Sequence, residues 1–264
     1  FLAEYPFAVD PVSDARPYPR HFLGLRSASR LFTSSVGEWL PFAEWGYLAL
    51  IATLVQAVVV AGLLTLLPAM LRGRSGRVRL PPLLGYFGSI GVAYLMAEIA
   101  AIQQLSLLLG HPVYAVTAVL AAMLVGSGVG SLWSDRVARS KGWLVALALS
   151  AALVILGLLL LDAVHLMQAG PLVLRLLAAC AFLLPLSFLM GQPFALGLRV
   201  LARGSQSRLA WAWGVNGFAS VVAAPLGALI ALEVGSRALF FVAAAGYGVA
   251  ALLYVLRSRQ ATGV

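Results

Sequence analysis

A carboxylate, two amides and a hydroxyl lie within nine residues of an otherwise apolar stretch, at Glu98, Gln103, Gln104 and Ser106. Isolated polar groups are costly in hydrocarbon because no water solvates them there. A carboxylate at such a depth can bind a proton, a cation or a polar group of a ligand. We therefore predict that Glu98 is the centre of a ligand- or proton-binding site. The structural alternative is a glutamic acid that hydrogen-bonds to a neighbouring helix.

The positions of these side chains around a helix divide them into two groups. At about 100° per residue, Tyr94, Glu98, Gln103 and Ser106 fall within one half of the helix, whereas Gln104 points away from them. We predict that the first group lines the site. Because the helix carries polar side chains on two sides, we expect it to lie inside a bundle and not at its lipid edge.

Two polar side chains of later apolar segments are further candidates for the site. Gln192 lies in a segment that contains Pro185 and Pro193. Prolines kink or break helices and free backbone carbonyls, and broken helices at membrane depth often line substrate sites. The alternative for this segment is a helix exit with an interfacial turn. Asn216 is predicted to hydrogen-bond with Glu98 or Gln192.

Two short motifs indicate contacts between helices. Gly126 and Gly130 have the spacing that lets two membrane helices approach closely, so we predict a packing role for them. Asp135 and Arg136 follow in a segment that loosely resembles a loop of major facilitator transporters. That resemblance implies that Asp135 and Arg136 latch the ends of neighbouring helices.

The elements that must position these residues are membrane-spanning helices. The 264 residues are 62% hydrophobic and 10% charged, whereas a soluble domain has roughly 25% charged residues. A spanning helix needs about 20 apolar residues. We predict an all-α integral membrane protein with an extramembrane or interfacial tail over residues 1–44, a seven-helix domain over 45–257 and a cytoplasmic tail over 258–264. The runs that qualify as spans are 45–71, 83–109, 112–133, 143–164, 171–191, 209–232 and 237–256. Within the first tail, residues 21–42 are expected to form short interfacial amphipathic pieces or a lid on the bundle.

The net charge of +9 indicates membrane topology and not nucleic-acid binding. Lysines and arginines gather after the first, third and fifth runs and after the last, which is the pattern of cytoplasmic segments. The carboxyl terminus is therefore expected in the cytoplasm. Arg175 lies one turn inside its run and needs a partner, which Asp162 or Glu233 can supply.

The sequence contains no self-contained catalytic constellation. There is no Ser-His-Asp order, no phosphate-binding loop and only one cysteine, Cys180. His21, His111 and His165 lack the close spacing of metal ligands. We therefore expect no catalytic residue, metal or cofactor in this chain.

Three segments together resemble the membrane domain of spermidine synthase-like proteins: Asp14–Phe22, Glu98–Pro112 and Met190–Gly197. Ser13 and Ala15 depart from the acidic pattern of the first segment, and Ala195 replaces a proline of the third. In that family a Rossmann-like transferase domain is coupled to a helical membrane domain. The resemblance implies that this chain, which starts at Phe1, is the membrane part only, and that a soluble domain precedes it.

The resemblance and the polar residues favour binding or conduction of a small polar or cationic ligand around Glu98, for which a polyamine is one candidate. Two alternatives stay open: a half transporter of the major facilitator type, and a non-catalytic scaffold or accessory subunit that packs against other membrane proteins. The expected partners are the lipid bilayer and, in the third case, other membrane subunits. We expect the chain in a bacterial cytoplasmic (inner) membrane.

Overall fold

The protein is an all-α integral membrane protein. The computed structural model describes residues 12–14, 16–18, 44–71, 80–201 and 206–262. Seven helices of this part are long and apolar enough to cross a membrane. The amphipathic pieces expected over 21–42 lie outside the described residues. The helices are α3 (Trp45–Leu71), α4 (Leu80–Leu109), α5 (Pro112–Trp133), α6 (Gly142–Met167), α7 (Leu172–Met190), α8 (Gln192–Leu201), α9 (Gln206–Glu233) and α10 (Ser236–Thr262).

The predicted spans agree closely with these helices because each span is a continuous apolar run with a polar or glycine-containing link at its ends. The link Gly110-His111 turns the chain between α4 and α5: Gly110 has a φ of 74°, and the His111 side chain accepts a hydrogen bond from the Val113 N–H. Pro112 then occupies the first position of α5, where a missing N–H costs nothing. The apolar span of α10 is Ser236–Leu256, and the helix itself continues through Thr262.

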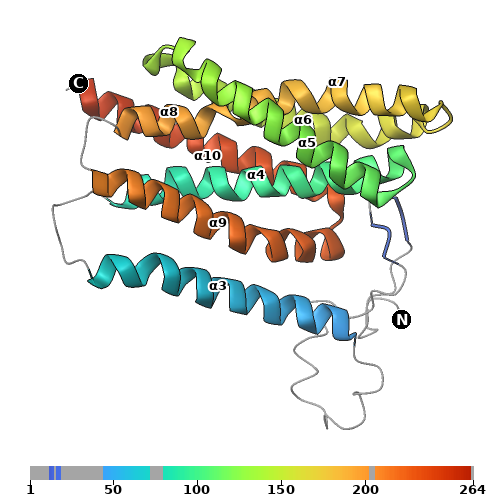
Figure 1. The fold of residues 1–264 in the computed structure, drawn as a ribbon, viewed down its shortest axis with the longest axis horizontal. Helices are drawn as coiled ribbons and strands as arrows, with labels where there is room; N and C mark the ends of the chain where they lie inside the picture. The colour runs from blue at the N-terminus through green and yellow to red at the C-terminus, as the bar shows by residue number, and fades with distance from the viewer. Residues whose placement is uncertain (1–11, 15, 19–43, 72–79, 202–205, 263–264) are drawn as a thin grey trace, which may run out of the picture.

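The helix α4 is the centre of the bundle (Figure 1). It packs against α5, α6, α7, α8, α9 and α10, and it is the most deeply buried of the described spans. The helix α3 lies at the periphery and packs mainly against α9, so most of its apolar surface faces outward. The sequence expectation that the helix with polar side chains lies inside the bundle is thus met.

The span formed by α7 and α8 is interrupted at Gly191 and not at either proline. Pro185 lies inside α7, and Pro193 is the second residue of α8. The two helices together form one apolar segment, Leu172–Leu201. The interruption therefore falls within the span, which is where a site-lining break was expected.

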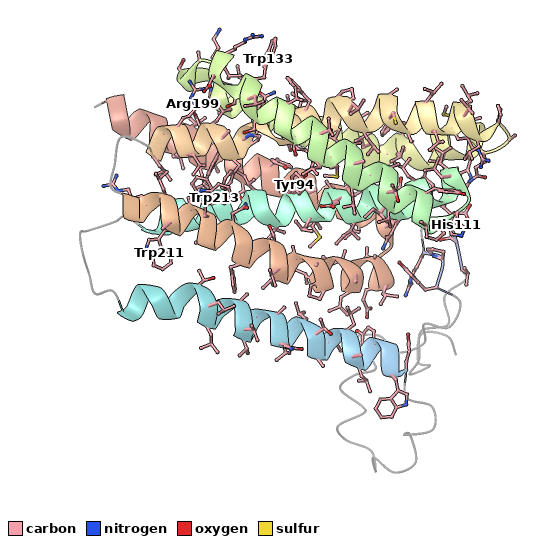
Figure 2. All side chains as sticks on the ribbon, viewed as in Figure 1. Tyr94, His111, Trp133, Arg199, Trp211 and Trp213 are labelled. Atoms are coloured by element: carbon pink, nitrogen blue, oxygen red, sulfur yellow. The ribbon has the colours of Figure 1, made fainter. Side chains whose placement is uncertain are left out.

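The bundle has two chemically different ends. We call the end that carries Arg136, Lys141 and Arg199 the basic end; it is on the left in Figures 1 and 2. The labels of Figure 2 place Trp133, Trp211 and Trp213 toward this end and His111 at the other, which we call the opposite end. Tryptophan side chains near the ends of membrane spans are typical of the membrane–water interface.

Candidate functional site

Glu98 lies at the middle of the central helix. The apolar segment of α4 is Gly85–Leu109, and Glu98 is about 16 Å from its end at Leu109 at the usual rise per residue. The Glu98 side chain is half-buried. Among the described residues no side chain makes an ion pair or a hydrogen bond with its carboxyl group. The sequence therefore placed the carboxylate at the middle of its span, and the described residues supply it with no side-chain partner.

The polar neighbour that the structure gives Glu98 is Tyr94, on the same helix. The hydroxyl of Tyr94, one turn earlier on α4, lies within electrostatic range of Glu98 and beside the Ser127 side chain of α5. Figure 2 shows Tyr94 in the middle of the bundle. Two of the predicted site residues, Tyr94 and Glu98, are thus together. Ser127 is a residue that sequence reasoning missed, because it stands between two glycines that were assigned to helix packing alone.

The interruption at Gly191 meets α5 at the same position. A Cβ added to Gly191 would lie 2.6 Å from the carbonyl carbon of Ser127, so the two backbones touch. Gln192 follows directly and is buried. The α7–α8 interruption, α5 and Tyr94 of α4 are therefore adjacent at this level, and Gln192 lies next to the layer that holds Tyr94.

Asn216 lies elsewhere in the bundle. Its Nδ2 donates to the carbonyl oxygen of Phe87 at 3.1 Å, and the Ser220 hydroxyl donates to that of Gly91 at 3.4 Å. Phe87 precedes Glu98 by about 16 Å along α4. The structure therefore directs the Asn216 amide to α4 near the basic end and not to Glu98 or Gln192. The reason is that α9 crosses α4 at Gly91, and this crossing fixes the level of Asn216.

The other three polar side chains that the sequence marked on this helix, Gln103, Gln104 and Ser106, make no hydrogen bond with Glu98. The Ser106 hydroxyl donates to the Ile102 carbonyl in the same helix at 2.6 Å. Gln103 Nε2 donates to the Tyr18 hydroxyl at 3.2 Å, and burial raises the pKa of that phenol. Gln104 is 1% exposed, and its amide has no hydrogen-bond partner among the described residues. The hydrogen bonds of Gln103 and Ser106 thus run to Tyr18 and to their own helix, and not to Glu98.

Gly126 and Gly130 lie where α5 crosses α7. A Cβ on Gly126 would lie 2.8 Å from Ser187 Cβ, and one on Gly130 would lie 2.8 Å from the carbonyl carbon of Phe188. The Ser187 hydroxyl donates to the Ala122 carbonyl across the same contact at 3.0 Å. Absence of side chains at the two glycines therefore sets the distance between α5 and α7.

Asp135 and Arg136 contact different partners at the basic end. Asp135 pairs with Arg199 of α8, whose Nε is 3.4 Å from its Oδ1, and the Arg199 guanidinium also donates to the carbonyls of Ser134 and Val137. Arg136 stacks at 3.7 Å over the ring of Trp133. The connection to α8 thus runs through Asp135, while Arg136 contacts the end of α5 that precedes it.

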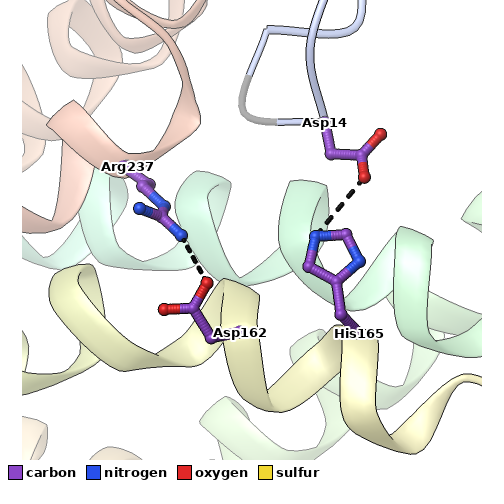
Figure 3. A network of polar contacts seen from close by, with 4 residues as sticks. All are labelled: Asp14, Asp162, His165 and Arg237. Atoms are coloured by element: carbon purple, nitrogen blue, oxygen red, sulfur yellow. Dashed lines mark hydrogen bonds and ion pairs between the residues drawn. The ribbon is translucent and has the colours of Figure 1, made fainter.

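The opposite end holds a set of polar contacts, two of which Figure 3 shows. Asp162 pairs with Arg237 at 3.1 Å, and His165 with Asp14 at 3.4 Å. Asp162 therefore does not supply the partner expected for Arg175. The Arg175 Nη1 instead donates at 2.9 Å to the carbonyl of Leu108, in the last turn of α4, where helix carbonyls lack partners.

Glu233 is also engaged with a different partner. The hydroxyl of Tyr47 on α3 donates to its Oε1 at 2.6 Å. Arg16 Nε donates to the Leu232 carbonyl at 2.8 Å, so the described part of the amino-terminal segment lies on this end of the bundle. Both contacts lie at the ends of helices, and neither involves Glu98.

The described residues contain no group of three or more His, Cys, Asp or Glu side chains that can hold a metal ion. The polar groups that the structure places together at the candidate site are the Glu98 carboxyl group and the Tyr94 hydroxyl. No family model, no curated protein and no solved structure matches this chain.

Proposed function

We propose that this chain is a membrane domain that binds a small cation or a proton at Glu98. The observation that carries the proposal is a carboxyl group at mid-span on the central helix that has no ion-pair or hydrogen-bond partner among the described residues. A carboxyl group that served only to join two helices would be hydrogen-bonded to one of them. An intramembrane acid without such a bond is by default a functional group.

The resemblance to the membrane domain of spermidine synthase-like proteins adds a ligand class to this proposal. A polyamine is a cation with several amino groups, and a carboxylate in a medium of low dielectric constant is a suitable counter-charge for one of them. The Tyr94 hydroxyl, which lies within electrostatic range of the carboxyl group, can accept a hydrogen bond from an ammonium group.

Labelling with a lipid-soluble carbodiimide tests the proposal, because this reagent adds to protonated carboxyl groups and not to carboxylates. In the purified full chain in lipid nanodiscs, we expect mass spectrometry to find the label at Glu98. Labelling should fall as the pH rises from about 5 to 9, or when Na⁺ or spermidine is added, because either change converts the carboxyl group to a carboxylate.

The control for this experiment is Glu98→Gln, which keeps the size of the side chain and removes the reactive group. Asp162, which is exposed at the opposite end, serves as an internal reference for carboxylates in water. Labelling of Glu98 that is the same at every pH and with every cation would contradict the proposal and favour a scaffold role for the chain.

We further propose that the basic end faces the cytoplasm of a bacterial cell, which follows the distribution of lysine and arginine. In a Cys180→Ser background, Ser140→Cys reports the basic end and Gln168→Cys the opposite end; both positions are exposed. An impermeant maleimide added to intact spheroplasts should label Gln168→Cys and leave Ser140→Cys unlabelled until the cells are lysed. The reverse pattern would invert the topology.

A further inference from the structure

Near mid-span, one face of α4 is partly exposed and the other is fully buried. At about 100° per residue, an arc of about 140° between positions 94 and 102 contains five half-buried side chains: Tyr94, Leu95, Glu98, Ile99 and Ile102. The other four side chains of this stretch point to the remaining arc and are at most 3% exposed: Met96, Ala97, Ala100 and Ala101. We call the five half-buried residues the lateral window.

The same face of α4 is covered on both sides of the lateral window. Phe87 comes eleven residues before Glu98 and Leu105 seven residues after it, so both point within about 20° of the Glu98 direction. Phe87 is 0% exposed and Leu105 is 1% exposed. The Phe87 ring packs against Phe194 of α8, which packs against Trp213 of α9, with ring centroids 5.4 and 4.7 Å apart. Along this face, the exposed surface around Glu98 is therefore confined to the middle of the span.

The lateral window lies between α5 and α9. At one edge, Tyr94 is beside Ser127 of α5. At the other edge, Ile99 contacts α9, since a Cβ on Gly227 would lie 2.9 Å from Ile99 Cδ1. Both helices pack against α4 without an extensive contact with each other, and Figure 1 shows α4 between them. The described part of the chain therefore leaves the window open at the side of the bundle, where the lipid lies.

A carboxyl group in such a window needs a positive charge beside it whenever it is ionised, because an isolated charge is unfavourable in hydrocarbon. The lysine and arginine side chains of the described helices lie near the two ends of the bundle, so a second copy of this chain offers none at this depth. A cation dissolved in water is separated from Glu98 by the covered parts of this face. A solute of the bilayer, in contrast, meets the window directly.

We propose that Glu98 takes its cation sideways from the bilayer through the lateral window, and that this cation is an amine with an apolar body. The inference rests on the proposed function and narrows its ligand class. The amine arrives as the neutral base, and its nitrogen lone pair accepts the proton of the Glu98 carboxyl group. The product is an ammonium–carboxylate pair, so the total charge does not change. Leu95, Ile99 and Ile102 offer apolar surface to the body of the ligand.

Two carbodiimides of different solubility test the route with the full chain in lipid nanodiscs. We expect dicyclohexylcarbodiimide, which dissolves in the bilayer, to label Glu98, and a charged water-soluble carbodiimide to leave Glu98 unlabelled. The water-soluble reagent should still label Asp162, which is exposed at the opposite end. Labelling of Glu98 by both reagents at similar rates would show an aqueous path and overturn the lateral route.

Ala224 of α9 is the position at which a larger side chain should close the window. Ala224 is exposed and lies between Ser220, which donates to the Gly91 carbonyl, and Gly227, which contacts Ile99. We expect the loss of Glu98 labelling by dicyclohexylcarbodiimide in Ala224→Trp, and Ala224→Leu covers a failure of this variant to fold. The matched control Ala151→Trp, at an exposed position of α6, should be labelled like the wild type. Wild-type labelling in a folded Ala224→Trp would overturn the route.

The ligand class is tested by protection of Glu98 from the same label. The probe is N,N-dimethyldodecylamine, a tertiary amine that cannot form an amide with the activated carboxyl group. It should protect Glu98 at a bulk concentration at least about tenfold below that of spermidine, because its chain concentrates it in the bilayer. Dodecanol, which has the chain without the amine, should not protect.

The outcomes separate this inference from the proposed function. Protection by spermidine at the lower concentration, or by dodecanol as well as by the amine, would overturn the apolar amine and leave a cation or proton site at Glu98 intact. Labelling of Glu98 that changes with neither amine, nor with Na⁺ or pH, would overturn both.

Discussion

Substitution of Gly130 by alanine should separate α5 from α7 and destabilise the protein more than any other single methyl group that we consider. The added Cβ would fall on the backbone of Phe188, 2.8 Å from its carbonyl carbon and 3.1 Å from its Cα. Backbone atoms cannot rotate away as a side chain can, so the helices must move apart. We expect the free energy of unfolding to fall by about 3 kcal/mol, measured by titration with sodium dodecyl sulfate in mixed micelles.

The same helix provides a matched control at Gly128. A Cβ at this position meets no atom within 4 Å. Gly128→Ala should therefore leave stability unchanged or raise it by up to about 1 kcal/mol through helix propensity. Equal losses in Gly128→Ala and Gly130→Ala would show that glycine is needed in α5 for a reason other than its contact with α7.

Substitution of Gly91 by alanine should disturb the crossing of α4 and α9. The new Cβ would lie 2.6 Å from the Asn216 carbonyl oxygen, 3.0 Å from Asn216 Nδ2 and 3.1 Å from the Ser220 hydroxyl oxygen. The overlap pushes α9 away from α4 and weakens the hydrogen bond from Asn216 to Phe87. We expect a loss of about 2 kcal/mol in the free energy of unfolding, measured in the same titration.

Gly88, one turn earlier on α4, is the control for this prediction. A Cβ there would be 3.6 Å from Val215 Cγ1, which is an ordinary van der Waals contact. Gly88→Ala should change stability by less than about 1 kcal/mol. If Gly91→Ala were as stable as Gly88→Ala, the close approach of α9 at Gly91 would not be a feature of the protein in the membrane.

The spans and the depth of the carboxylate could be read from the sequence because they are local properties. A run of about 20 apolar residues has the length of a membrane crossing whatever its neighbours are. Glu98 lies at mid-span because the run extends almost equally far before and after it. The spacing of Gly126 and Gly130 likewise predicts a close approach on one face of α5, but not that the partner is α7.

The partners of the polar side chains required the tertiary structure. Asn216 donates to Phe87 and not to Glu98, and Arg175 donates to Leu108 and not to a carboxylate. Both side chains donate to backbone carbonyl oxygens. Every residue of a helix has such a carbonyl, so the sequence does not indicate which one is the acceptor. The interruption at Gly191 beside Ser127 was equally hidden, since Pro185 and Pro193 were the stronger signals for a break.

The sequence by itself determined that this protein is a bundle of seven membrane helices with an acid at the middle of the second, because hydropathy and length act along the chain. Only the tertiary structure decided which helices pack around α4, and that Asn216 of α9 donates to the carbonyl of Phe87 on α4. In lipid, apolar helices gain little from pairing as such, so neighbours are chosen by the fit of small residues and by hydrogen bonds between faces. This fit depends on the surfaces of both helices, so the sequence pattern of one helix does not specify its partner.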